Sequence, residues 1–161
     1  MSLSPVILTR GTPEAWYMMP LFLERVRKFT GSHTDVGEDP LPELLAGAFG
    51  TKDQRALMIA ILDDEKTLPE ALVGHVACGV ETYLGRSVCM VHQFEKEKTP
   101  DQDKEAMKTL NYSIQALIDN WCHAIGLDEI MIMAETESRA RLFKFFGYKP
   151  GPVLMRRKFN G

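Results

Sequence analysis

The sequence predicts a single soluble α/β domain over residues 1–161, and three observations support this prediction. The length suits one domain with a sizeable core, and a content of 45% apolar and 25% charged residues is typical of globular proteins. Short apolar runs of strand length occur in the middle of the chain, of which Ala56–Leu62 is the clearest. A long amphipathic helical pattern follows, and no repeat or interdomain linker interrupts the order.

Helical signals open the chain. Thr12 offers an N-cap, and Pro13 occupies the first helical position. Apolar residues then recur at helical spacing, but Pro20 predicts a kink or a division into two short helices. We expect a loop over residues 32–40 and a second short helix over Glu43–Phe49.

Three strands are predicted in the middle of the chain. The run Ala56–Leu62 has the length and continuous apolar character of a buried strand. A second strand is expected over Leu72–Glu81, and Tyr83–Arg86 has the composition of a hairpin turn. The strand Ser87–Phe94 then pairs back on its predecessor.

The longest helix follows the hairpin. A capping box is predicted at its start, with Thr99 as the N-cap and Gln102 at the third helical position. Gly126 is expected to end the helix. One apolar stripe runs along it: Met107, Leu110, Ile114, Leu117 and Trp121.

The C-terminal part of the chain predicts three short elements. A buried strand is expected over Glu129–Ala134, followed by a short helix over Ser138–Phe146 that Gly147 caps. The last strand is expected over Val153–Phe159.

Two segments carry a resemblance to a known family. Arg141–Pro150 resembles the closing helix and Gly-aromatic turn of the GNAT acetyltransferase superfamily, and Trp121–Gly126 resembles the end of its long helix. The resemblance covers the second half of the chain well, and the first half by element order. It implies an α/β (α+β) fold with a central mixed, mostly antiparallel sheet flanked by helices. It also implies a first strand at Val6–Thr9 and acetyl-CoA as the cofactor.

The cofactor motif of that family is changed in this chain. In the family, the turn into the long helix carries Q/R-x-x-G-x-G/A, whose backbone N–H groups bind the pyrophosphate of coenzyme A. Here no glycine occurs between Arg86 and Ile125, and acidic residues near the helix start repel a phosphate. Cationic side chains are therefore the candidate cofactor ligands: Lys96, Lys98, Lys104 and Arg139.

The catalytic motif of the last helix is changed as well. The family places a tyrosine there, whose hydroxyl protonates the departing thiolate. Counting back from Gly147 puts Phe143 at this position, and Thr136 stands where an asparagine is often found. The resemblance is thus to a degenerate member of the family.

Strand alternation suggests where a base would lie. A hairpin at Tyr83–Arg86 brings Glu81 and His92 to one face of the sheet, where either side chain would deprotonate an incoming amine. The alternative interpretation is that His92 is a hydrogen-bonded core residue and that Glu81 is solvated. The other members of the face are small, apolar or imidazole side chains: His75, Ala77, Gly79, Val88 and Met90.

Charge and composition argue against several other functions. A net charge of −3 gives no global attraction to nucleic acid or to an anionic membrane. The start of the chain lacks the apolar region of a signal peptide, so we expect a cytoplasmic protein. Neither the four histidines nor the cysteines have the spacing of metal ligands, and no metal is expected. The cysteines are expected to be buried free thiols: Cys78, Cys89 and Cys122.

Two functional hypotheses follow. The first is an acetyl-CoA-dependent N-acetyltransferase that acts on an amine-bearing acceptor. The second is a non-catalytic GNAT-fold protein with a structural or interaction role, whose aromatic run over Phe143–Tyr148 contacts a protein partner. Glycine-poor versions of the fold are also similar to bacteriophage-encoded proteins, which implies a virion component or a host-modulating protein.

Overall fold

The structure is a computed structural model, and it describes residues 2–8, 12–30, 55–98, 103–134 and 136–151. The predicted loop at 32–40, the helix at 43–49 and the last strand at 153–159 lie outside these residues. The elements follow in the order β1 (Leu3–Ile7), α1 (Pro13–Thr30), β2 (Ala56–Asp63), β3 (Leu72–Tyr83), β4 (Arg86–Lys96), α3 (Lys104–Ala124), β5 (Ile130–Ile132) and α4 (Glu137–Phe145).

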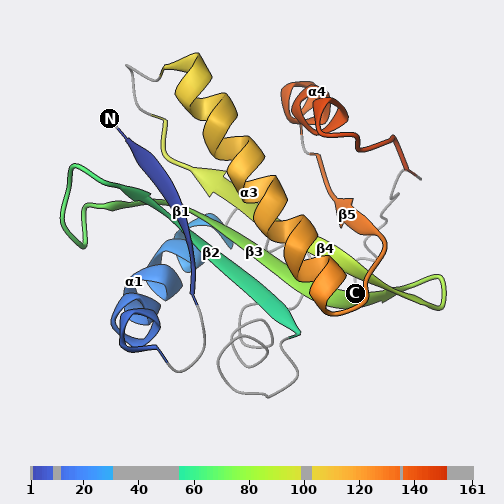
Figure 1. Cartoon of the computed structure of the whole chain (residues 1–161), viewed down its shortest axis with the longest axis horizontal. Coiled ribbons are helices and arrows are strands. Elements are labelled where there is room, and N and C mark those ends of the chain that lie inside the picture. Colours follow the sequence, from blue (N-terminus) through green and yellow to red (C-terminus); the bar gives the residue numbers. More distant parts are fainter. Residues whose placement is uncertain (1, 9–11, 31–54, 99–102, 135, 152–161) are drawn as a thin grey trace, which may run out of the picture.

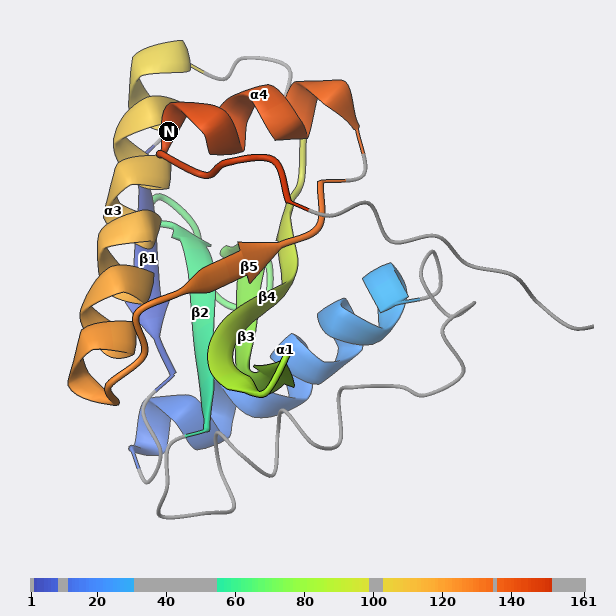
Figure 2. The same cartoon turned by 90° about the vertical axis from the view of Figure 1, so that its right-hand side faces the viewer.

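A five-stranded sheet forms the centre of the molecule, with the strands in the order β1-β2-β3-β4-β5. The first four strands pair antiparallel, and β5 pairs parallel to β4. α1 covers one face of the sheet and α3 covers the other, while α4 lies past the end of β4 (Figures 1 and 2). The predicted mixed, mostly antiparallel sheet with flanking helices is confirmed.

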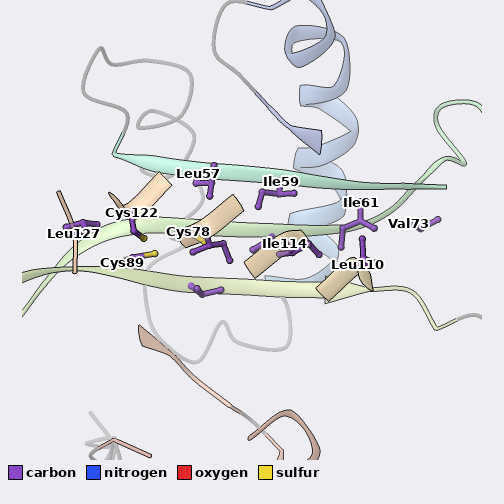
Figure 3. Packing of buried hydrophobic residues seen from close by; sticks show 13 residues of the cluster. Leu57, Ile59, Ile61, Val73, Cys78, Cys89, Leu110, Ile114, Cys122 and Leu127 are labelled. Carbon is purple, nitrogen blue, oxygen red and sulfur yellow. The ribbon is translucent and has the colours of Figure 1, made fainter. Parts of the chain in front are cut away.

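Each face of the sheet buries its own core, which explains why β2 is apolar throughout. Successive side chains of a strand point to opposite faces, so Leu57 and Ile59 pack toward α3 while Met58 and Ala60 pack toward α1. The larger core lies under α3, where Ile114 is fully buried (Figure 3).

α1 is one helix that continues through Pro20. Of the two predicted alternatives, a kink or a division into two helices, the division is therefore wrong and the kink stays a prediction. Pro20 itself is exposed. The residues on either side of Pro20 that lie at helical spacing on the sheet-facing side are buried: Met18, Phe22 and Arg25. We infer that their packing offsets the backbone hydrogen bond that proline cannot donate.

α3 begins later than the capping box predicted. Its N-cap is Asp103, whose carboxylate accepts a hydrogen bond from the backbone N–H of Glu105 at 3.0 Å. The N-cap at Thr99 is therefore wrong, because an aspartate four residues on satisfies the first turn. The end of the helix is as predicted, since Gly126 has a φ of +78° and the N–H of Leu127 returns to the carbonyl of Cys122 at 2.8 Å.

The shorter elements agree with the sequence to within a few residues. The hairpin turns through Leu84 and Gly85, both with positive φ, as a two-residue turn requires. β1 occupies Leu3–Ile7 instead of Val6–Thr9. Its pairing begins with Leu3 opposite Asp63, and the hydroxyl of Ser2 donates to the carboxylate of Asp64, which extends the strand toward the N-terminus.

Candidate functional site

β4 contains a bulge at the point where it leaves β5. Cys78 of β3 pairs with Val91, but Ala77 pairs with Gln93, so His92 is the additional residue. Within the described residues, β5 pairs with β4 at Cys89–Val91. A bulge of this kind redirects a side chain and ends regular pairing, and such bulges often lie beside active sites.

Past the bulge, one edge of β4 has no strand beside it among the described residues. The N–H of Glu97 donates to the carbonyl of Val73 in β3 at 2.9 Å. By alternation, the backbone groups of Phe94 and Lys96 point away from β3. This edge therefore presents backbone donors and acceptors between α3 and α4.

The bulge brings together the two predicted bases. His92 Nε2 lies 3.1 Å from Glu81 Oε1, with the His92 side chain 20% exposed and the Glu81 side chain 47% exposed. A carboxylate accepts hydrogen bonds, so this contact places the ring proton of a neutral His92 on Nε2 and leaves Nδ1 as an acceptor. The contact agrees with the prediction that strand alternation puts Glu81 and His92 on one face of the sheet. The catalytic role of both residues stays a prediction.

His75 lies in a different environment from His92. It is fully buried, 2.6 Å from Gln93 Oε1 through Nε2, and its ring meets Phe22 edge-on at 5.4 Å. Burial lowers the pKa of His75 to about 4, and the positive charge of Arg25 acts in the same direction, against the raising effects of Gln93 and Glu95. His75 is thus a neutral core residue. The bulge places Gln93, and not His92, opposite Ala77, which lies two residues after His75 on the same strand.

This buried histidine predicts a pH-dependent stability. Its ordinary pKa of 6.5 applies to the unfolded chain, so the unfolded state binds the proton first as the pH falls from 6.5 to about 4. Between pH 8 and pH 5, we expect His75 to cost about 2 kcal/mol of unfolding free energy. Urea unfolding of His75→Gln should show a shallower pH dependence than wild type. The same slope in both proteins would contradict this assignment, and His92→Gln is the matched control.

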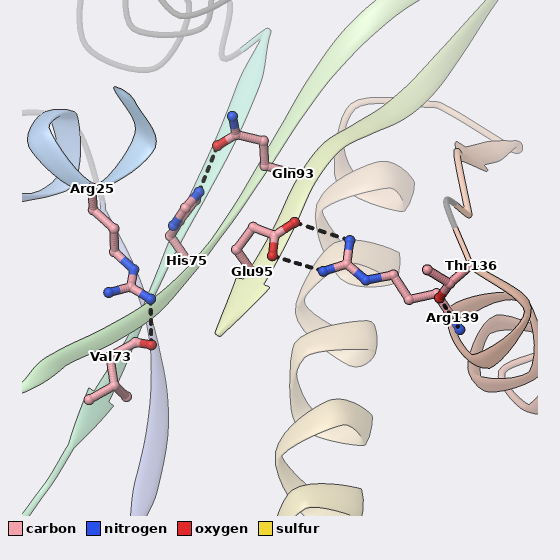
Figure 4. A network of polar contacts seen from close by, with 7 residues as sticks. All are labelled: Arg25, Val73, His75, Gln93, Glu95, Thr136 and Arg139. Atoms are coloured by element: carbon pink, nitrogen blue, oxygen red, sulfur yellow. Dashed lines mark hydrogen bonds and ion pairs between the residues drawn. The ribbon is translucent and has the colours of Figure 1, made fainter. Parts of the chain in front are cut away.

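Two arginines from opposite sides hold the acidic end of β4 (Figure 4). Arg25 of α1 donates to Glu97 Oε1 at 2.7 Å and to the carbonyl of Val73 at 2.6 Å. Arg139 of α4 forms two hydrogen bonds with the carboxylate of Glu95, at 3.0 and 2.8 Å. Both ion pairs were missed in the sequence, because each joins residues far apart in the chain.

The predicted lysine ligands are not gathered at one place. Lys96 donates to the carbonyl of Glu97 at 2.7 Å, and burial lowers its pKa. Lys98 is exposed beyond the end of β4. Lys104 begins α3, beside the Asp103 carboxylate that caps the helix. The structure therefore does not assemble the three lysines into a single anion site.

Lys104 instead lines a cavity of about 320 Å³ between α3 and α4. Lys108 is a second cation there and was missed in the sequence, although its i,i+4 spacing from Lys104 was a usable signal. The Lys108 Nζ atom also lies 5.9 Å from the centroid of the Phe145 ring. The remaining lining is amide, apolar or aromatic: Met107, Asn111, Leu142, Phe145 and Phe146.

The aromatic residues near the C-terminus are divided between core and surface. Phe143 is buried and packs edge-on against Phe94 at 6.2 Å and Tyr148 at 5.7 Å. The Tyr148 hydroxyl donates to Gln115 at 3.1 Å, and burial raises its pKa. Phe145 is 57% exposed. Phe143 is thus a core residue.

The three cysteines lie together in the core under α3 (Figure 3). All are buried free thiols, as predicted. Burial raises the pKa of Cys122 to about 12, and the pKa of Cys89 is raised by its contact with Cys78 and by burial. Thiols held in this protonated form are poor nucleophiles.

Two further searches cover the described part of the chain. No three histidine, cysteine or acidic side chains converge there as they would around a metal ion. None of the helices in the described ranges is both long enough and apolar enough to cross a bilayer.

No protein-family model and no curated protein matches the sequence. Solved structures match it over nearly the whole chain. An aminoglycoside 6′-N-acetyltransferase from Acinetobacter baumannii is 10% identical with a TM-score of 0.60, and covers 99% of this chain and 100% of its own. A ribosomal-protein-alanine N-acetyltransferase from Brucella melitensis biovar Abortus 2308 is 14% identical with a TM-score of 0.58, with the same coverage. A Trypanosoma brucei acetyltransferase is 12% identical with a TM-score of 0.59, and covers 98% of this chain and 100% of its own. The chain therefore has the GNAT acetyltransferase fold.

Proposed function

We propose that this chain is an acetyl-CoA-dependent N-acyltransferase with a divergent cofactor site. The observation that carries the proposal is the His92–Glu81 pair, which sits in the β4 bulge directly after the last pairing of β4 with β5. A base at this point lies beside the β4 edge that has no neighbouring strand in the part of the chain that the structure describes. The fold shared with acetyltransferases supports the same assignment.

The residues at the helix end fit acetyl-CoA through side chains and not through backbone amides. The Asp103 carboxylate occupies the first turn of α3, where a phosphate would otherwise bind. Lys104 and Lys108 line a cavity with aromatic walls, which suits the anionic nucleotide end of the cofactor. The open edge at Phe94 and Lys96 suits the amide-containing arm.

Acetyl-CoA supplies an activated acetyl group as a thioester. His92 is the general base in this proposal, since its Nδ1 accepts the proton that an acceptor amine gives up. Glu81 is the positioning residue that fixes the tautomer by accepting from Nε2. Phe143 donates no proton, so the departing thiolate would take a proton from water, and the proton that His92 accepted from the amine would return to the solvent.

The proposed acceptor is a small molecule or a protein that bears an amine. The names of the similar structures point to both classes, since one acts on aminoglycosides and another on a ribosomal-protein alanine. An exposed Glu81 beside the base favours a cationic acceptor.

The proposal is tested first by binding. Acetyl-CoA at about 100 times its Kd should stabilise the native state by about 2.7 kcal/mol and raise the melting temperature by several degrees. The double change Lys104→Gln and Lys108→Gln should reduce that shift. Lys144→Gln is the matched control, because this exposed lysine of α4 does not line the cavity. No shift in the wild type, together with no heat in calorimetry, would exclude the enzyme.

The second candidate is a non-catalytic interaction protein, such as a phage virion component or host-modulating protein. Two observations favour it: the carboxylate at the α3 N-terminus and the exposed aromatic side chains of Tyr112 and Phe145. A protein that gives no acetyl-CoA shift and no turnover fits this candidate. A protein that turns over acetyl-CoA with an amine excludes it.

A further inference from the structure

The Glu95–Arg139 pair joins the end of β4 to the first turn of α4. Arg139 donates from Nη1 to Oε1 at 3.0 Å and from Nη2 to Oε2 at 2.8 Å, although the residues are 44 positions apart. The Arg139 side chain is 33% exposed and that of Glu95 is 14% exposed. This two-bond geometry is the one by which arginine also binds phosphate.

The pair lies at the open edge of the sheet. Glu95 follows the bulge at His92 and stands past Val91, where the pairing with β5 ends. Figure 4 shows the Glu95 side chain reaching from β4 toward α4, with the guanidinium of Arg139 between the two elements. An anionic ligand that enters along this edge meets Arg139 and the carboxylate that holds it.

We propose that Arg139 is an anion-binding residue that exchanges Glu95 for a phosphate group of the ligand, so that Glu95 is an internal competitor. This inference rests on the proposed function. The exchange replaces two charge-assisted hydrogen bonds with two others. It leaves the Glu95 carboxylate, whose side chain is 14% exposed, without its arginine partner, and the contacts of the phosphate with Arg139 offset that cost. It also supplies the cation that the glycine-free turn and the Asp103 cap make necessary.

Arg25, the other arginine at this end of β4, is unsuited to the same exchange. It is 7% exposed and donates to the backbone carbonyl of Val73 at 2.6 Å, so releasing it uncovers buried polar groups. Arg139 is the more exposed of the two, and its acceptor is a side chain. The ion pair Glu95–Arg139 is therefore the one that a ligand can open.

Glu95→Gln tests the exchange by calorimetry with acetyl-CoA. Because Glu95→Gln lacks the competing carboxylate, its Kd for acetyl-CoA should be about fivefold lower than that of wild type. Arg139→Gln should raise it by about tenfold, and the double variant should bind no better than Arg139→Gln alone. An unchanged Kd in Glu95→Gln overturns the exchange while leaving the acyltransferase in place.

Glu97→Gln is the matched control for charge. It removes the same negative charge from the same end of β4, but its partner is Arg25, and glutamine keeps an oxygen that accepts. Relative to wild type, the Kd of Glu97→Gln for acetyl-CoA should change by less than the Kd of Glu95→Gln does. Equal strengthening in both variants would mean that net charge alone acts, and the exchange would be wrong.

Inorganic pyrophosphate separates this inference from the proposed function. It should bind Glu95→Gln more tightly than wild type, and the gain should disappear with Arg139→Lys, which keeps the charge but loses the two-bond geometry. If acetyl-CoA binds neither wild type nor Glu95→Gln while pyrophosphate still binds Glu95→Gln more tightly, that result would support the exchange and contradict the proposed acyltransferase function. If pyrophosphate binds both proteins equally or not at all, the exchange is overturned. Thermal unfolding confirms that each variant is folded.

Discussion

Replacing His92 with glutamine is expected to lower kcat for acetyl transfer by at least about a hundredfold, which is the contribution of a positioned general base. The ring sits in the β4 bulge, 20% exposed and 3.1 Å from Glu81 through Nε2, and in the proposed function its Nδ1 atom accepts the proton of a substrate amine. The effect should fall on kcat more than on KM for acetyl-CoA, because His92 does not line the cavity between α3 and α4. Steady-state kinetics with an amine acceptor measure both constants.

Glu81→Gln completes the test of this pair. Glutamine keeps an oxygen that accepts from Nε2 but loses the charge, so kcat should fall by less than in His92→Gln. His123→Gln is the matched control, since this exposed histidine of α3 bonds within its own helix, to the carbonyl of Asp119 at 2.7 Å, and lies outside the proposed site. A His92→Gln enzyme as active as His123→Gln would remove His92 from the mechanism.

Replacing Arg25 with methionine is expected to lower the free energy of unfolding by about 2 kcal/mol, in the range for buried polar groups that lose a hydrogen-bond partner. Arg25 is 7% exposed, and the acceptors of its guanidinium include Glu97 at 2.7 Å, the Val73 carbonyl at 2.6 Å and the Leu72 carbonyl at 3.3 Å. Methionine fills a similar volume but donates nothing, so the buried carbonyls lose this donor. Urea unfolding followed by circular dichroism measures the loss.

Arg86→Met is the matched control for this change. Arg86 pairs with Glu129 at 3.2 Å, but its side chain is 66% exposed, and an exposed pair contributes about 1 kcal/mol or less. Arg25→Lys keeps the charge without the planar donor geometry and should fall between wild type and Arg25→Met. Equal losses in Arg25→Met and Arg86→Met would show that burial of the α1 arginine contributes little.

The elements that follow from local signals were predicted closely. β2 was expected over Ala56–Leu62 and occupies Ala56–Asp63, because a continuous apolar run reports burial on both faces. The stop at Gly126 and the turn before Arg86 were also found, since a positive φ is a local property that favours glycine.

The boundaries that depend on competition between neighbours were predicted less well. Thr99 and Asp103 both suit an N-cap, and the aspartate forms it. Pro20 predicts a break from local backbone chemistry, but the packing of Phe22 and Arg25 against the sheet continues the helix. In both cases the local pattern was sound, and a neighbouring interaction decided the outcome.

The sequence by itself predicted the kind and order of the elements in the described residues and the shared face of Glu81 and His92, whose catalytic role stays a prediction. Hydrophobic period, caps and turn residues act within a few positions, so one chain suffices to show them. Only the tertiary structure decided that a bulge separates His92 from His75, and that Arg139 meets Glu95 from 44 residues away. These contacts depend on strand register and on which helix end reaches the sheet, and neither is written in any local stretch of sequence.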